Sequence, residues 1–219
     1  MIVKAKKSTG ILHPKEEFKC KKVIFAGKIN KPKFSQLKLD MTGIYYIPRI
    51  VKASKKGDAA ILKELIKILS IEGVRVISSL YFNPDLSLSR GNYSKLKPDK
   101  NDLRDIRKGI KSLTNSNAYD HTQAAIVRNN IVVKETSKGT RRLIKSIKKI
   151  KKNNGILIKF PKKKQDLRAD LPTVGLDTFK DCKKAGLKGI VLKSKQNVFL
   201  NKSKCISFAN KNKMFITVK

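Results

Sequence analysis

The sequence predicts an α/β protein built from two α/β domains. Three observations predict this fold class: short apolar runs alternate with amphipathic helical patterns, glycines separate many of them, and one polar stretch divides the chain. Alternation of this kind is typical of parallel or mixed sheets with helices packed on their faces. A chain of 219 residues with 40% hydrophobic content is long enough for two domains that each have a core.

The N-terminal half predicts an incomplete Rossmann-like parallel sheet. Residues 23–27 form an apolar run typical of a buried strand. Residues 57–71 carry isoleucines and leucines at helical spacing, and Gly73 follows as a stop signal. Residues 74–77 predict the next strand, which completes a strand–helix–strand rhythm.

A polar stretch interrupts this alternation between residues 80 and 100, with Pro84 near its start and Pro98 near its end. Prolines and polar residues of this kind are typical of connections rather than of regular elements. We therefore predict a domain boundary near residue 96, with one domain over residues 1–96 and a second over residues 97–219.

The C-terminal half predicts a mixed α/β sheet. The helix that opens at Pro98-Asp99 places Leu103, Ile106 and Leu113 on one face. Two short strands flank Arg128-Asn129-Asn130, which is a hairpin signal. The predicted elements from this hairpin onward are strands over 124–127 and 131–133, a helix over 139–150, a strand over 156–159, a helix over 177–185, strands over 189–192 and 198–200, a helix over 203–210 and a strand over 215–218.

Positive charge is the strongest compositional feature of the chain. Lysine and arginine number 52 against 16 acidic residues, a formal net charge of +36. Such a field attracts nucleic acid, acidic lipid headgroups and phosphorylated substrates alike. Arginine is scarce, aromatic residues make up 6% and tryptophan is absent, which disfavours base readout and stacking platforms. A lysine-filled solvated surface, a membrane-surface role and nucleic-acid binding stay open as interpretations, and no nucleic-acid partner is expected.

The cysteines and histidines favour a cytoplasmic protein without a zinc site. Cys20, Cys182 and Cys205 are widely spaced and form no CxxC pair. An odd number of isolated cysteines is typical of reduced thiols. His13 and His121 do not combine with them at a zinc-ligand spacing. No apolar run is long enough to span a membrane, and the N-terminus lacks the apolar core of a signal peptide.

Residues 164–175, Lys-Gln-Asp-Leu-Arg-Ala-Asp-Leu-Pro-Thr-Val-Gly, carry the most informative pattern. They follow a predicted strand and precede a predicted helix, which is where α/β sheets place ligands. Asp166 and Asp170 suit a hard divalent cation such as Mg²⁺, and Arg168 suits a phosphate oxygen. On spacing alone, an Asp–Arg–Asp salt bridge ahead of a helix is the alternative.

Three further groups carry weaker signals. Residues 135–142 join a strand to a helix, and Gly139 there leaves room for an anion at the helix start, or simply begins an ordinary capped helix. Asp58 follows Gly57 at the start of a predicted helix and is most simply its N-cap. His121 precedes a strand, where it is either a base or an ordinary surface or core residue.

On these residues the chain resembles the UDP-2,3-diacylglucosamine pyrophosphatases of the LpxI type, over residues 23–219. The Gln-Asp-x-Arg-x-Asp-Leu-Pro segment is the specific part of the resemblance. Weaker matches keep the family's order along the chain. They are Ala26-Gly27-Lys28 with Lys31-Pro32, Gly57-Asp58, Asp120 with Gln123, Gly139-Thr140, Thr178, and Ala185-Gly186-Leu187 with Gly189-Ile190.

The resemblance implies metal-dependent hydrolysis of the diphosphate of UDP-2,3-diacylglucosamine, in lipid A biosynthesis. The products would be UMP and 2,3-diacylglucosamine 1-phosphate, called lipid X, and the substrate would lie between two α/β domains. Catalytic roles fall on Asp166, Arg168 and Asp170, with Mg²⁺ or another divalent cation on Asp166 and Asp170. The implied substrate-binding residues are Gln165, Gly139, Thr140, Asp120, Gln123, Gly57, Asp58 and Lys28.

The sequence departs from the family pattern in three places. Lys138-Gly139-Thr140-Arg141 stands where the family usually has Glu-Gly-Thr-Asp, so two acids are replaced by bases. Ala59 replaces an acid that often follows the Gly-Asp pair. The family's opening strand and glycine-rich turn have no counterpart, so we expect a shortened N-terminal domain.

The resemblance also sets the expected location and partners. We expect a cytoplasmic enzyme that reaches the anionic cytoplasmic face of the inner membrane through its lysines, and a homodimer stays open. The runner-up function is that of a non-catalytic basic protein that binds RNA or acidic lipid.

Overall fold

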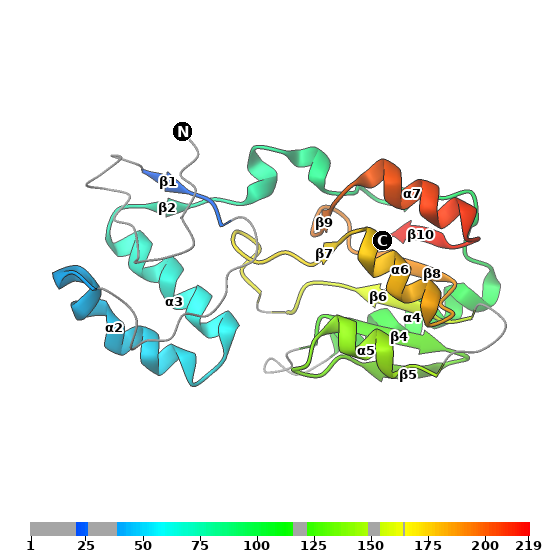
Figure 1. The fold of residues 1–219 in the computed structure, drawn as a ribbon, viewed down its shortest axis with the longest axis horizontal. Helices are drawn as coiled ribbons and strands as arrows, with labels where there is room; N and C mark the ends of the chain where they lie inside the picture. The colour runs from blue at the N-terminus through cyan, green and yellow to red at the C-terminus, as the bar shows by residue number, and fades with distance from the viewer. Residues whose placement is uncertain (1–20, 26–38, 116–121, 149–153, 164) are drawn as a thin grey trace. The chain divides into compact units, whose positions relative to one another are not determined.

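The computed structural model of the chain describes residues 21–25, 39–115, 122–148, 154–163 and 165–219 (Figure 1). The chain forms two compact units, Met1–Tyr81 and Phe82–Lys219. The boundary predicted near residue 96 differs from this division, which comes earlier in the chain, after Tyr81. The segment after Tyr81 belongs to the second unit because Leu88 is fully buried in that unit's core and Tyr93 packs against it.

The first unit contains a small parallel strand pair and two helices. Strand β1 (Lys22–Val23) pairs with β2 (Arg75–Val76), and the helices α2 (Met41–Ser54) and α3 (Asp58–Ile71) lie between them in sequence. A short 3₁₀ turn, η2 (Ser79–Tyr81), ends the unit. The predicted α/β character and the parallel strand pair are therefore confirmed.

Helix α2 was not predicted, and its composition explains why. Gly43 and Pro48 both lie inside it, and these two residue types disfavour a helix interior. Packing against α3 compensates: Tyr46 is buried, and its hydroxyl donates a 2.7 Å hydrogen bond to Glu72 Oε1. Tertiary contacts thus override local propensity in this helix.

The second unit is built on a mixed sheet of six strands in the order β3-β10-β8-β6-β4-β5. β10, β8 and β6 are parallel, whereas β3, β4 and β5 run antiparallel to their neighbours. Every residue of the three parallel strands is buried, which explains their continuous apolar sequences. The predicted mixed sheet is confirmed. Its strands are β3 (Gly91–Asn92), β4 (Ala124–Arg128), β5 (Ile131–Lys134), β6 (Ile156–Lys159), β8 (Gly189–Leu192) and β10 (Phe215–Val218).

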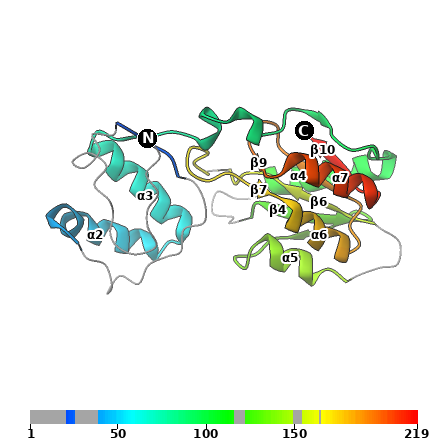
Figure 2. The ribbon, with the colours of Figure 1, turned by 45° about the horizontal axis from the view of Figure 1, so that its top comes forward.

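Helices cover both faces of this sheet (Figure 2). α4 (Lys100–Thr114) packs on one face, against Val127 and its neighbours. α5 (Thr140–Ser146), α6 (Leu176–Lys184) and α7 (Lys202–Lys211) pack on the other face, against Ile126 and its neighbours. Successive strand residues point to opposite faces, so adjacent residues of β4 belong to different core clusters.

The hairpin prediction is confirmed, whereas α5 is shorter than predicted. Asn129 and Asn130 form the two-residue loop with positive φ angles of 49° and 62°, as a type I′ turn requires. α5 ends at Ser146 because the backbone of Ile147 is extended, and its side chain packs against the core. Residues 149–150, to which the helix was predicted to extend, lie outside the described ranges.

Three small elements complete the second unit. β7 (Thr173–Val174), which was not predicted, pairs in parallel with β9 (Val198–Phe199). A 3₁₀ turn, η3 (Pro84–Leu86), lies in the polar stretch before the sheet. Within the described ranges, no helix has the length and apolar character that a bilayer span needs.

Cys182 and Cys205 are buried free thiols, whereas Cys20 lies outside the described residues. Burial raises the pKa of both thiols, to about 11 for Cys205. Both therefore stay protonated at neutral pH and pack as small apolar side chains.

We predict that Gly189→Ala destabilises the second unit by about 1–3 kcal/mol. A Cβ atom at Gly189 would overlap the ring of Phe215, which is fully buried in the core beneath α4. Urea unfolding followed by circular dichroism measures the change. Gly175→Ala is the matched control, because the nearest atom to its Cβ would be Leu200 Cβ at an ordinary 3.5 Å. Equal stability of the two variants would contradict the prediction.

Candidate active site

Strand direction brings several chain segments to one edge of the sheet. β5 and β6 both run antiparallel to β4, so they end at the edge where β4 begins. Glu135 follows β5, Lys159 ends β6, and Gln123 precedes β4. We call this the carboxyl edge, and it is the edge where α/β sheets usually bind ligands.

The Gln-Asp-x-Arg-x-Asp-Leu-Pro segment forms a compact loop at the carboxyl edge. The backbone N–H groups of Ala169 and Asp170 both donate to the carbonyl of Asp166, at 3.1 and 3.0 Å. Pro172, at the other end, accepts a 2.9 Å hydrogen bond from the N–H of Val198. A local turn and a strand pair therefore fix the loop, without a long helix or strand of its own.

Asp166 and Arg168 form a two-point ion pair inside this loop. Asp166 Oδ1 accepts from the backbone N–H and the Nε of Arg168 at 3.0 Å each, and Oδ2 accepts from Nη2 at 2.7 Å. The hydrogen bond raises the pKa of Arg168 above its ordinary value. The salt bridge considered from the sequence is thus present between these two residues. The Arg168 side chain is 53% exposed, so its guanidinium also faces solvent.

The two acids of the loop are of the residue type that binds magnesium, but the described residues form no closed protein cage for a metal. Among the described residues, no group of three or more His, Cys, Asp or Glu side chains is arranged to hold a metal. Mg²⁺ is commonly held by one or two carboxylates together with substrate phosphates and water. Asp166 and Asp170 supply two carboxylates to the loop, the residue type that such a shared ion uses.

Glu135 is a buried acid that the sequence interpretation did not single out. It is 7% exposed, and its Oε2 accepts a 3.1 Å hydrogen bond from the hydroxyl of Thr140. Burial raises the pKa of Glu135, while the Thr140 hydrogen bond and the charges of Lys159 and Lys162 oppose that shift. Gly139 precedes α5 with a φ of 84°, a conformation that favours glycine.

Lys159 is a buried lysine at the end of β6, and it was also missed. It is 9% exposed, and its Nζ donates a 2.9 Å hydrogen bond to the carbonyl of Thr173. Burial lowers the pKa of Lys159, and the charges of Glu135 and Asp170 oppose the change. One sequence signal was available: Lys159 is the charged residue of an otherwise apolar strand, Ile-Leu-Ile-Lys, rather than part of a polar run.

A cavity of about 190 Å³ opens beside Lys159, between the starts of α5 and α6. Arg141, one of the basic departures from the family pattern, pairs across it with Asp181 at 3.2 Å. The replacement is therefore balanced by an acid on the neighbouring helix. The cavity is lined by Thr140, Arg141, Ile144, Lys159, Asp177, Thr178 and Asp181.

The other residues proposed from the sequence are spread over the chain. The Gln123 carbonyl accepts the N–H of Phe160 at 2.9 Å, which holds Gln123 at the carboxyl edge. Gln165 Oε1 accepts the N–H of Lys162 at 2.8 Å, and its Nε2 is buried without a hydrogen-bond partner among the described residues. Lys28, Asp120 and His121 lie outside those residues.

Gly57 and Asp58 belong to the first unit, at the start of α3. Gly57 is the cap residue, with a φ of 101°, and Asp58 is the first helical residue. The expected N-cap role of Asp58 was therefore wrong by one position. Its acid still suits the first turn of a helix, where the backbone carries partial positive charge.

Comparison with known families covers both units. The LpxI N-terminal domain family matches residues 3–86, and the LpxI C-terminal domain family matches residues 89–217. The chain belongs to the LpxI family. Over 206 residues it is 28% identical to the protein named UDP-2,3-diacylglucosamine pyrophosphatase LpxI from Caulobacter vibrioides. The alignment covers 90% of this chain and 74% of that protein. The resemblance seen in the sequence is thereby confirmed.

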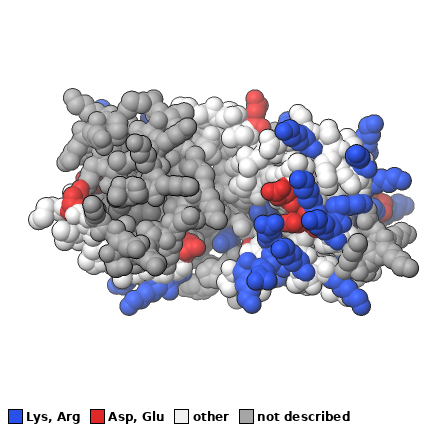
Figure 3. Space-filling model, in the orientation of Figure 1, with Lys and Arg blue, Asp and Glu red and all other residues white. Residues whose placement is uncertain are grey.

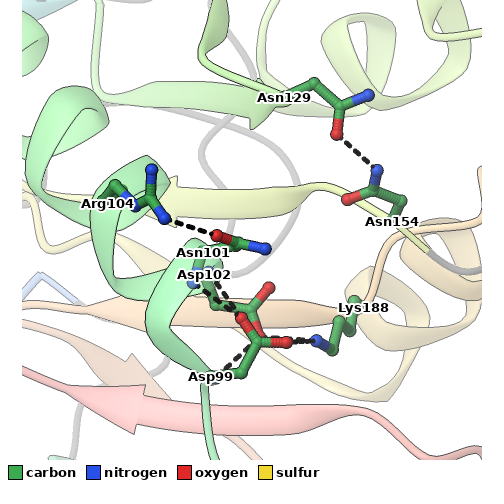
Figure 4. Close-up of polar contacts among 7 residues, drawn as sticks. All are labelled: Asp99, Asn101, Asp102, Arg104, Asn129, Asn154 and Lys188. Carbon is green, nitrogen blue, oxygen red and sulfur yellow. Dashed lines mark hydrogen bonds and ion pairs between the residues drawn. The ribbon is translucent and has the colours of Figure 1, made fainter.

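A larger cavity, of about 280 Å³, lies at the opposite edge of the sheet, but its charged groups bind one another (Figure 4). Lys188 Nζ donates to Asp99 Oδ2 and Asp102 Oδ2, both at 2.6 Å. Asp99 and Asp102 also form the capping box of α4. Asp105 accepts the N–H of Asn130 at 2.8 Å. The cluster therefore stabilises the start of α4 and the hairpin turn, and we assign it a structural role.

We predict that Lys188→Met destabilises the protein at pH 7 by about 1–3 kcal/mol, because it leaves the buried Asp102 carboxylate without its cation. The hydrogen bond from Lys188 lowers the pKa of Asp99 to about 2 from an ordinary 3.8. A lowered acid pKa stabilises the fold above pH 3.8, and this stabilisation is lost as the pH falls through about 2.

The stability difference between Lys188→Met and the wild type should therefore narrow as the pH falls from 4 towards 2. Urea unfolding at several pH values measures it. Lys180→Met is the control, because Lys180 is exposed and its nearest acid, Asp177, is 3.9 Å away. We expect that control to change stability by no more than about 0.5 kcal/mol. A difference that stays constant with pH would contradict this account of Asp99.

Proposed function

We propose that the chain hydrolyses the diphosphate of UDP-2,3-diacylglucosamine to UMP and lipid X, in lipid A biosynthesis. The observation that carries the proposal is the Gln-Asp-x-Arg-x-Asp-Leu-Pro loop at the carboxyl edge, in a chain that belongs to the LpxI family. The name of the Caulobacter vibrioides relative supports the substrate. Arg168, Asp166 and Asp170 supply the groups that such a reaction requires.

The chemistry follows from the charge of the substrate. A diphosphate repels an attacking hydroxide, so cationic groups that neutralise its oxygens lower the barrier. Arg168 suits this role because Asp166 holds its guanidinium at two points, and a guanidinium is always charged at physiological pH. Mg²⁺ bound to Asp170 and Asp166 would neutralise further charge and lower the pKa of a bound water.

The departures from the family pattern are compatible with this proposal. Arg141 stands where the family usually has an acid, but it forms an ion pair with Asp181 of α6, which offsets its positive charge. Thr140 keeps its hydroxyl bonded to Glu135. The two acids of the specific motif, Asp166 and Asp170, are both present. We therefore propose that activity does not depend on acids at positions 138 and 141.

Loss of either acid of the motif should abolish most turnover. We predict that Asp166→Ala and Asp170→Ala each lower the rate of UMP release by at least about 10²-fold, the scale of one lost catalytic group. EDTA should inhibit the wild type, and added Mg²⁺ should restore it. The assay incubates the full chain with UDP-2,3-diacylglucosamine and separates UMP from lipid X.

Asp85→Ala is the matched control, because Asp85 is exposed in η3 and should leave the rate unchanged. Full activity of both motif variants would refute their proposed roles. Absence of UMP release by the wild type, with RNA binding that weakens steeply as salt rises, would instead favour the non-catalytic basic protein.

The surface charge supports a second proposal, that the enzyme binds anionic membrane, where a diacylated substrate resides. Figure 3 shows lysine and arginine side chains gathered over the second unit, with few acids between them. α4, on the other face of the sheet, is also basic. The exposed basic residues of α5, α6 and α7 form what we call the basic face: Arg141, Arg142, Lys145, Lys180, Lys184, Lys202, Lys204 and Lys211.

We predict that the chain binds vesicles of anionic lipid and that raising the salt from about 0.05 to about 0.5 M removes most of the binding. Each lysine near an anionic bilayer contributes about 1 kcal/mol. The double variant Lys180→Glu/Lys184→Glu should weaken binding more than its control on α4, Lys108→Glu/Lys111→Glu. Equal binding to neutral vesicles would show that the charge only solvates the surface.

A further inference from the structure

Lys159 carries a charge that its protein surroundings only partly satisfy. An ammonium group has three N–H donors, and removing it from water costs free energy unless those donors are paired. Among the described residues, Lys159 Nζ makes one hydrogen bond, to the carbonyl of Thr173. Nevertheless, the residue is only 9% exposed.

Lys188 shows what a structural lysine looks like in this protein. It is more exposed than Lys159, with 22% of its side chain accessible, yet its Nζ contacts two carboxylates at 2.6 Å. Lys159 has acids in its neighbourhood, Glu135 and Asp170, whose charges favour its protonated form. Within the described ranges, neither makes an ion pair with it. Burial lowers the pKa of Lys159, and the two acids oppose that shift without neutralising the amine by direct contact.

The position of Lys159 favours an anionic ligand. Strand alternation places its side chain on the face of the sheet that α5 and α6 cover, and it lines the cavity between the starts of those helices. The hydroxyl residues Thr140 and Thr178 line the same cavity. Its bond to Thr173 also holds it beside the end of the motif loop.

A second observation points to a missing acceptor in the same segment. Gln165 Nε2 is buried and has no hydrogen-bond partner among the described residues, although Gln165 Oε1 is bonded to the Lys162 N–H. Buried amide donors are rarely left unpaired, and each exception calls for an explanation. An oxygen-rich anion bound at the carboxyl edge would supply the acceptor.

We propose that Lys159 is a phosphate-binding residue, whose ammonium contacts a non-bridging oxygen of the substrate diphosphate. The inference rests on the proposed function for the identity of the anion. What it adds is the role of this lysine in binding that anion. In a site shielded from water, an ammonium attracts a phosphoryl oxygen far more strongly than an exposed lysine does. Lys159 would therefore complement Arg168, whose side chain is exposed on the motif loop.

The test replaces Lys159 in two ways. Lys159→Met removes the charge and the donors but keeps the length of the side chain, whereas Lys159→Gln removes the charge and keeps an N–H donor for the Thr173 carbonyl. Removing a buried charge that has no ion-pair partner relieves its desolvation cost, but Lys159→Met also leaves the Thr173 carbonyl without its donor. These two effects oppose one another, so we expect both variants to fold, with melting temperatures close to that of the wild type. Lys188→Met is the matched control.

Two readouts separate binding from structure. UDP, used as the diphosphate probe, should raise the melting temperature of the wild type and of Lys188→Met, but of neither Lys159 variant. The kcat/KM for UDP-2,3-diacylglucosamine should fall by about 10²-fold or more in both Lys159 variants, the scale of one lost charge-stabilising donor. Lys188→Met should keep its kcat/KM at a temperature where it is folded.

The opposite results would overturn the proposal. Near-normal kcat/KM in Lys159→Gln would show that the donor to Thr173 is sufficient and that Lys159 is structural. Unfolding of both Lys159 variants would also make it structural. Failure of the proposed function would give a different result. The wild type would release no UMP, but UDP would still raise its melting temperature and would not raise that of the Lys159 variants.

Discussion

The direction of β4, β5 and β6 is the constraint on which the rest of this structure depends. β4 runs against both of its neighbours, so β5 and β6 end together and β4 begins at the same edge. This arrangement brings Gln123, Glu135 and Lys159 to one place, although they lie far apart in the sequence. The motif loop leaves β6 at that edge and is anchored by β7 and β9. A one-residue change of register would turn Lys159 away from α5 and α6, because side chains alternate between faces.

Charged side chains are paired differently at the two edges of the sheet. At one edge, Lys188, Asp99 and Asp102 neutralise one another within hydrogen-bond distance, and the larger cavity there is bounded by groups that are already satisfied. At the carboxyl edge, Lys159 and Glu135 are both buried, yet Lys159 donates to a backbone carbonyl and Glu135 accepts from the Thr140 hydroxyl. Cavity size is therefore a poor guide to function here. The more informative property is the balance between buried donors and acceptors, which at the carboxyl edge includes the unpaired Gln165 Nε2 among the described residues and supports the proposed anion site.

The sequence was most informative where a pattern has a local cause. Continuous apolar runs identified β6, β8 and β10 because both faces of these strands are covered, and Asn129-Asn130 identified the hairpin because asparagine tolerates positive φ. α2 was missed because its stability comes from α3, which no local propensity records. Lys159 and Glu135 were missed for a related reason. In a chain with 52 basic residues, the place of Lys159 at the end of an apolar strand is a weak signal, and its burial is known only from the fold. Motif spacing indicated Asp166 and Arg168 and left a salt bridge between them as an alternative, which the fold shows to be present.

Excess positive charge acts differently at the surface and at the site. Exposed lysines on α4 to α7 are screened by salt, so their effect on any one phosphate is weak and shared by many groups. Lys159 is screened far less, because its ammonium is buried beside Glu135 and under the motif loop. The basic replacement Arg141 forms an ion pair with Asp181, which locally offsets its positive charge. The number of surface lysines can thus vary widely with little effect on the electrostatic field at the carboxyl edge, because a few buried groups set that field. This separation is compatible with a chain that has a net charge of +36 and yet has both acids of its family motif.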